Sequence, residues 1–180
     1  MTDEISSQYI WSDWYCYNDE TMLVNLPDNS GIYEVRTDFE IGRLQGSSSI
    51  VTIGRAKNLK ERRCQKVADP IRYLNRAEKW LLQYSHVLEF HYCVCSNFEE
   101  AKYKEVIRQL EYEGQHWELP PGNDRLETTP LNKIILDIFG MSKEKLAEEL
   151  FHGRLEAIQV AKCLQVPMDI INNFVVYWGK

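Results

Sequence analysis

Two stretches in the first third of the chain alternate apolar and polar residues. They are Gly31–Thr37 and Ile50–Gly54, and both are rich in β-branched residues. Alternation with a period of two predicts strands, and the Gly/Ser-containing link Asp38–Ser49 predicts a loop that joins them as a β-hairpin. A third stretch of the same character, Val87–Cys95, predicts a third strand.

Apolar residues at the helical period, flanked by capping residues, predict helices elsewhere. The expected helices begin and end near these residues: Leu59 to Val67, Pro70 to Tyr84, Asn97 to Glu113, Thr129 to Gly140, Ser142 to Gly153, Arg154 to Leu164 and Met168 to Tyr177. Together the elements predict an α/β fold: a small three-stranded sheet flanked by helices, followed by an all-helical C-terminal extension. We expect an aromatic-rich segment at 1–25, a core domain at 26–124 and the extension at 125–180.

Composition narrows the class of protein. Apolar residues make up 44% of the 180 residues, enough for a real core. No apolar run reaches the roughly 18 residues that a membrane span needs. The five cysteines are odd in number and scattered, which predicts reduced thiols and a cytoplasmic location. The segment at 1–25 holds Tyr9, Trp11, Trp14, Tyr15 and Tyr17, for which we weigh core packing against a base-stacking platform.

The charge is uneven along the chain. A net charge of −6 excludes a protein that coats nucleic acid with its whole surface. Arg55–Arg76, however, holds eight basic residues against Glu61 and Asp69. A local patch of this density suits a few phosphates, with an affinity that falls steeply as salt rises.

The order of several sequence motifs resembles the GIY-YIG nuclease family. Gly31-Ile32-Tyr33 ends in the first tyrosine, Thr52-Ile53-Gly54 stands at the second motif, and a basic helix follows at once. The resemblance covers roughly Leu26–Asn123 and is closest to the nuclease domain of the excision-repair endonuclease subunit and to homing endonucleases. It implies metal-dependent hydrolysis of DNA phosphodiesters, with Mg²⁺ or Mn²⁺ as cofactor and the DNA backbone as partner.

The resemblance also assigns roles to particular residues. Tyr33 matches the family's general base or water-orienting group; because a free phenol titrates near about 10, that role needs neighbouring cations or a metal. Arg62 matches the helix arginine, whose planar guanidinium suits phosphate. Glu105 matches the carboxylate that holds the metal. Asn123 matches the asparagine that braces the site. We expect further substrate contacts from Arg55, Lys57 and Arg63.

Two positions depart from the family pattern. Thr52 replaces the tyrosine of the second motif, and threonine is shorter and does not titrate usefully. Lys66 stands where the family often has histidine or tyrosine, one helix turn beyond Arg62. A lysine there supplies a second phosphate contact or a positive charge beside Tyr33. The alternative function that Thr52 favours is a catalytically degraded relative that binds nucleic acid or protein.

Simpler interpretations stand beside each assignment. Tyr33 also suits ordinary sheet packing, Arg62 a solvated helix face, Glu105 a surface ion pair with Arg108, and Asn123 the chemistry of a turn. An unrelated α/β domain is the third alternative.

Other features invite weaker readings. The alternating His91, Cys93 and Cys95 are too far apart along a strand, about 3.3 Å per residue, to share one zinc ion. Arg154–Val176 resembles a helix-turn-helix whose buried positions are Ala161, Leu164, Val166 and Ile170. Its second helix, Met168–Val176, has no Lys or Arg. We therefore weigh helix packing or a homodimer contact through these helices against DNA reading.

Overall fold

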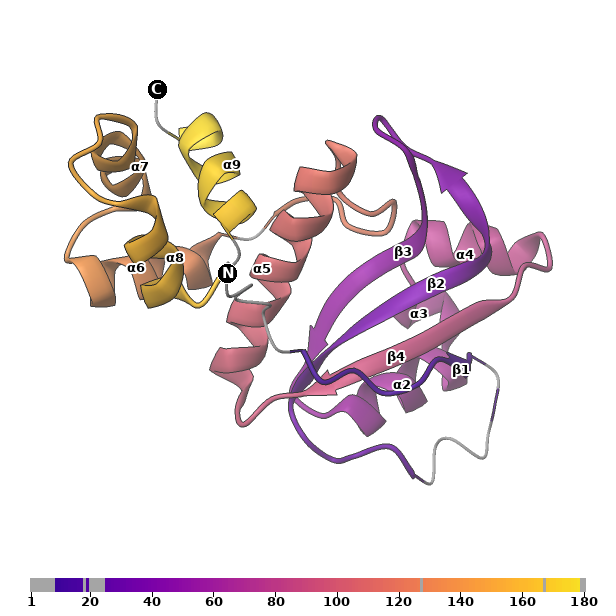
Figure 1. The fold of residues 1–180 in the computed structure, drawn as a ribbon. Helices are drawn as coiled ribbons and strands as arrows, with labels where there is room; N and C mark the ends of the chain where they lie inside the picture. Colours follow the sequence, from indigo (N-terminus) through magenta and orange to yellow (C-terminus); the bar gives the residue numbers. More distant parts are fainter. Residues whose placement is uncertain (1–8, 18, 20–24, 127, 167, 179–180) are drawn as a thin grey trace. The chain divides into compact units, whose positions relative to one another are not determined.

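The computed structural model describes residues 9–17, 19, 25–126, 128–166 and 168–178, which form a mixed α/β structure (Figure 1). Ile10–Leu126 forms one compact unit, and Tyr9 together with the described residues after Leu126 forms a second. In the first unit the elements are β1 (Tyr15–Cys16), β2 (Gly31–Gly42), β3 (Ser47–Ala56), α2 (Leu59–Ala68), α3 (Pro70–Tyr73), α4 (Arg76–Gln83), β4 (Leu88–Val94) and α5 (Phe98–His116). In the second they are α6 (Thr129–Phe139), α7 (Lys143–Phe151), α8 (Ala157–Leu164) and α9 (Met168–Trp178).

Among the described residues the sheet has four strands, in the order β1-β4-β2-β3, and every pair is antiparallel. The expectation of three strands is therefore wrong in number. The fourth strand comes from the aromatic N-terminal segment, where Tyr15 pairs with Phe90 and Cys16 with Glu89. A strand of two residues is too short to show an alternating pattern, so the hydrophobic pattern does not reveal it.

The hairpin is longer than the alternation predicts. β2 and β3 continue through most of the stretch 38–49 expected to be a loop. The register shifts between Arg36 and Ile41, which marks an irregularity where the polar residues enter the strand. Gly46 closes the hairpin with a φ of +70°, a left-handed conformation that glycine adopts without strain.

The helices of the first unit cover both faces of the sheet. α2 and α4 contribute Leu59 and Leu81 to a buried cluster with Tyr33, Val35 and Phe90 on one face. α5 packs against β2 and β3 on the other face. The side chains that alternate along β2 therefore point toward different helices, and this division decides which candidate residues meet.

The helix expected over Pro70–Tyr84 is two helices. Leu74 is extended, with φ −81° and ψ 145°, and ends α3. Asn75 then caps α4: its side chain accepts from Glu78 N, and the Glu78 carboxylate accepts from Asn75 N. This capping box satisfies two backbone donors at the new start, so the chain turns here.

The end of α5 also differs from the expectation. The helix continues through Gly114 to His116 and is capped by Trp117, whose φ is +60°. Glycine lowers helix stability without forcing a stop, so packing of the neighbouring turns carries the helix past it.

The second unit consists of four helices in its described part. Ala161, Leu164, Val166 and Ile170 are all buried, which confirms the expected burial pattern of α8 and α9. Gln165, between the two helices, has a left-handed φ of +54°. Within the described ranges, no helix is both long enough and apolar enough to cross a membrane.

Candidate functional site

Tyr33 and Gly54 form the centre of the candidate site. They lie directly opposite each other in the β2–β3 register, and the phenol ring covers the glycine. A Cβ added to Gly54 would lie 2.6 Å from both Cζ and Oη of Tyr33. Only glycine leaves room for the ring here, which gives a physical reason for a glycine at this place in the second motif.

A buried polar network lies next to this ring. Lys66 Nζ is 2.8 Å from Glu78 Oε1 and 3.0 Å from Glu78 Oε2, and both side chains are almost inaccessible to water. Thr52 Oγ1 donates to Glu78 Oε1 over 2.9 Å and accepts from Asn75 Nδ2 over 2.6 Å. The Thr52 hydroxyl is therefore used to orient Glu78, on the face of the sheet that Tyr33 occupies.

Lys66 also brings positive charge to Tyr33, because its Nζ lies 5.0 Å from the ring centroid. Burial on its own lowers the pKa of Lys66, but its interactions with Tyr33 and Glu78 outweigh burial and raise that pKa. Lys66 is therefore cationic at neutral pH although it is buried. The expected charge beside Tyr33 is present, and Glu78 compensates it.

Arg62 lies one turn before Lys66 on α2 and is half-buried. Within the described part of the chain its guanidinium forms no hydrogen bond or ion pair. Its charge is close enough to Lys66 to oppose the positive form of that lysine. An arginine without a carboxylate partner keeps its fork of donors available for an anion such as phosphate.

Glu105 occupies the other face of the sheet. It projects from α5 and forms an ion pair with Arg55, which lies opposite Ile32 in the sheet register. The Glu105 side chain is 12% exposed. Tyr33 and Glu105 thus approach β3 from opposite faces, and the described contacts join each to a different partner.

A divalent metal at Glu105 would have to share the carboxylate with Arg55. Among the described residues, no group of three or more His, Cys, Asp or Glu side chains is placed to hold a metal ion. Mg²⁺ is commonly held by one or two carboxylates with several waters, so Glu105 fits in type. Arg55 is half-buried rather than enclosed, and its side chain would have to move.

Asn123 is placed to stabilise the outer edge of β3. Its Oδ1 accepts from Ile53 N over 2.9 Å, and its Nδ2 donates to Ile53 O over 2.7 Å. Gly122 N donates to Val51 O over 2.7 Å in the same turn. The turn therefore covers an edge strand that would otherwise present unpaired backbone groups, and holds the second motif against Tyr33.

Arg63 and Lys57, two residues expected to contact the substrate, differ in accessibility. Arg63 is 2% exposed, its Cζ lies 4.5 Å from the Tyr17 ring centroid, and its Nη2 donates to Cys16 O over 3.4 Å. It therefore holds the N-terminal segment, and reaching a phosphate would require that segment to move. Lys57 is exposed and lies 5.4 Å from the Phe98 ring centroid.

The N-terminal aromatics pack on the α5 face of the sheet. The His91 ring is stacked between Trp11 and Trp14, with centroids 4.2 and 3.6 Å away. His91 Nε2 is 2.8 Å from Glu34 Oε2, and Arg108 Nε donates to Glu34 Oε1 over 2.6 Å. These tryptophans therefore pack against buried residues.

Glu34 should make part of the stability depend on acidic pH. Burial raises its pKa, but hydrogen bonds and charge from His91 and Arg108 outweigh burial and hold the pKa below its usual range. This contribution is therefore complete above the ordinary carboxyl value of about 4.3 and is lost as the pH falls below it. We expect Glu34→Gln to lower the free energy of unfolding by about 1.5–3 kcal/mol at pH 7. The variant should also lose less stability than the wild type as the pH becomes acidic.

Urea midpoints measured between neutral and acidic pH check this prediction. The exposed Glu40 supplies the matched control, since Glu40→Gln should leave both the midpoint and its fall with decreasing pH unchanged. A fall in the urea midpoint with decreasing pH that is as steep in Glu34→Gln as in the wild type would contradict the prediction.

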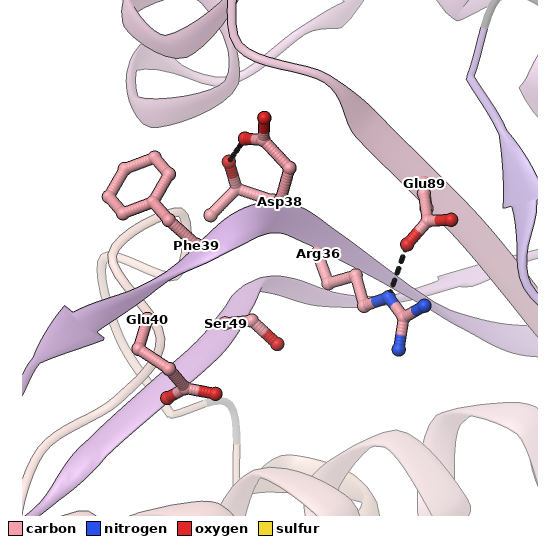
Figure 2. Close-up of a pocket in the computed structure, with 7 residues that line it drawn as sticks. Arg36, Asp38, Phe39, Glu40, Ser49 and Glu89 are labelled. Carbon is pink, nitrogen blue, oxygen red and sulfur yellow. Dashed lines mark hydrogen bonds and ion pairs between the residues drawn. The ribbon is translucent and has the colours of Figure 1, made fainter.

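A separate hollow of about 260 Å³ opens near the distal part of β2. Figure 2 shows its lining: Arg36 reaches Glu89, with Nε and Oε2 2.5 Å apart, and Asp38 and Glu40 lie nearby. The hollow thus holds three carboxylates, and its arginine is already paired. An anion such as phosphate would be repelled, so this hollow is not the phosphate site.

Sequence reasoning missed Glu78 and Asn75. The signal was the spacing of an asparagine three residues before a glutamate, which is typical of a capping box. It was overlooked because the apolar period continues across the break at Leu74.

A scan against protein-family models, a search of curated proteins and a search of solved structures each find nothing that matches this chain.

Proposed function

We propose that this chain is a metal-dependent endonuclease of the GIY-YIG type that hydrolyses DNA phosphodiesters. The observation that carries the proposal is the placing of Tyr33 over Gly54, with the Lys66 ammonium beside the ring. A phenol that orients or deprotonates water needs positive charge nearby at neutral pH. Arg62, unpaired within the described residues, adds donors for the phosphate oxygens.

In this proposal each side chain has a separate task. Tyr33 orients the attacking water, and Arg62 binds the non-bridging oxygens of the phosphate. Lys66 holds positive charge at the ring and is itself fixed by Glu78. Glu105 is the carboxylate that would hold Mg²⁺ or Mn²⁺, but it lies on the opposite face of the sheet and is paired with Arg55. A metal there could act as a Lewis acid on the phosphate at Tyr33 only after Arg55 and this part of the site rearrange.

We expect Tyr33→Phe to reduce cleavage about a hundredfold or more, because it removes the hydroxyl that orients water. Purified protein is incubated with supercoiled and branched DNA in Mg²⁺ or Mn²⁺, with EDTA as the blank. Tyr92→Phe is the matched control, since Tyr92 lies opposite Tyr33 in the β2–β4 register. Glu105→Gln should also reduce cleavage. Cutting that survives both Tyr33→Phe and Glu105→Gln would come from a contaminant and would overturn the proposal.

A second function has its own support. Tyr33 is only 5% exposed, and Arg55 occupies part of the Glu105 carboxylate. These observations favour a catalytically degraded relative that binds nucleic acid or a protein. Salt-sensitive DNA binding without cleavage of any substrate would select this function over the nuclease.

A further inference from the structure

The outer surface of α3 and α4 is unusual for this acidic protein. On α4 the exposed residues recur at the helical period and form one stripe: Arg76, Lys79, Trp80, Gln83 and, at the C-cap, Tyr84. The opposite side of α4 is buried through Glu78 and Leu81. Its fold requires only that inner side, so packing within the described residues gives no reason for the composition of the stripe.

Large aromatic and apolar groups lie in the open on this surface. Trp80 is 53% exposed and Tyr84 is 60% exposed, and their ring centroids lie 4.8 Å apart. Ile71, on α3, is 84% exposed. Single exposed apolar residues are common, but two aromatic rings in contact with each other and with water form a patch that suits a planar ligand.

Positive charge accompanies these rings. From Pro70 to Tyr84 the exposed charged residues are Arg72, Arg76 and Lys79, while the one acid, Glu78, is buried and paired with Lys66. Within the described residues none of these three cations forms an ion pair. Many other cations of the chain do: Lys102 pairs with Glu99, for example, over 2.7 Å.

We propose that the α3–α4 outer face (Ile71, Arg72, Arg76, Lys79, Trp80 and Tyr84) binds unpaired nucleotides of a nucleic-acid strand. Bases stack on the exposed side of Trp80, and the three cations contact the phosphates. Exposed aromatics next to unpaired basic side chains are the combination that holds single strands without reading their sequence. A base inside a duplex has no free ring face to offer, so the surface favours unpaired segments.

This inference rests on the proposed function, because it names the part of a DNA substrate that the chain would hold beside the bond it cuts. It implies a substrate with splayed or single-stranded segments. α4 connects the two surfaces: its inner side supplies Glu78 to the network beside Tyr33, and its outer side carries Trp80.

Binding of a labelled thymine oligonucleotide to the full chain in EDTA tests the inference without cleavage. Fluorescence anisotropy should show tighter binding of the single strand than of a matching blunt duplex, with quenching of tryptophan emission. We expect Trp80→Ala to weaken binding of the single strand about five- to hundredfold. Trp117→Asn is the control, because Trp117 is 66% exposed, more than Trp80, and asparagine tolerates its left-handed φ of +60°.

Salt titration provides a second, independent readout. Arg76→Gln and Lys79→Gln should each lower the slope of log affinity against log salt by about 0.7. Lys102→Gln should leave the slope unchanged, since Lys102 is paired with Glu99. Because all these side chains are on the surface, each variant should keep the wild-type urea midpoint.

Equal effects of Trp80→Ala and Trp117→Asn, or equal binding of single strand and duplex, would overturn the inference. The same holds for a protein partner that binds this face while the oligonucleotide does not. The two proposals fail separately. Cleavage of plain duplex that is insensitive to Trp80→Ala would leave the nuclease and remove the inference. Trp80-dependent strand binding without any cleavage would do the reverse.

Discussion

Replacing Lys66 with methionine should lower the free energy of unfolding by about 3–5 kcal/mol. Lys66 neutralises Glu78, which has no exposed surface at all. Without the ammonium, a carboxylate would remain buried with only the Thr52 hydroxyl and the backbone of Asn75 as donors. Two hydrogen bonds do not replace a full opposite charge at this depth.

Urea denaturation of three variants separates the loss of charge from the loss of packing. Lys66→Met alone should be severely destabilised, and the double variant Lys66→Met/Glu78→Met should recover much of the loss, since an apolar pair of similar volume removes the buried charge. Lys79→Met, on the exposed side of α4, should change stability by less than about 0.5 kcal/mol. A loss below about 1 kcal/mol in Lys66→Met would contradict the role assigned to the pair.

Alkaline pH should have a related effect. Because the folded state raises the pKa of Lys66, its contribution is complete below the ordinary lysine value of about 10.4 and is lost as the pH rises through the folded value. In Lys66→Met this part of the alkaline loss should be absent.

Gly54→Ala should displace the Tyr33 ring, with a loss of about 1–3 kcal/mol in stability and a loss of cleavage similar to that of Tyr33→Phe. The new methyl group would occupy space that the ring now fills, 2.6 Å from Cζ and Oη. The strand itself accepts alanine, so the penalty arises from the cross-strand contact.

The chain offers a matched control in Gly42→Ala, because no atom lies within 4 Å of a Cβ added at Gly42. Combining Gly54→Ala with Tyr33→Ala tests the cause, since the alanine at 54 should cost little once the ring is gone. If Gly54→Ala destabilised the Tyr33→Ala background as much as the wild type, the contact would not be the cause.

Pattern reasoning worked where one physical signal dominates. Alternation located β2 and β3, and the Asn58 cap located the start of α2 at Leu59. It failed where a second signal was short or hidden. The two residues of β1 are too few to alternate, and the capping box at Asn75 lies inside an apparently continuous helical period.

The candidate site shows the same division. The resemblance to the GIY-YIG family predicted that Tyr33, Thr52 and Lys66 would share one region, and the structure places all three on the face of the sheet covered by α2 and α4. Glu105 was expected with them, but its α5 packs on the opposite face and pairs it with Arg55. A linear sequence gives the order of the motifs, whereas the face on which each side chain projects depends on how the helices pack.

The amide bridge from Asn123 to Ile53 has a consequence during synthesis. The hairpin leaves the ribosome some 70 residues before Asn123 does. Until then β3 has an unpaired outer edge, to which a strand of a neighbouring nascent chain can add. Once the Pro-Pro-Gly-Asn turn has been made, it covers this edge and also holds the part of β3 that carries Gly54, against which the Tyr33 ring packs. The same turn therefore protects the exposed edge of β3 and holds Ile53 and Gly54 in place beneath the Tyr33 ring.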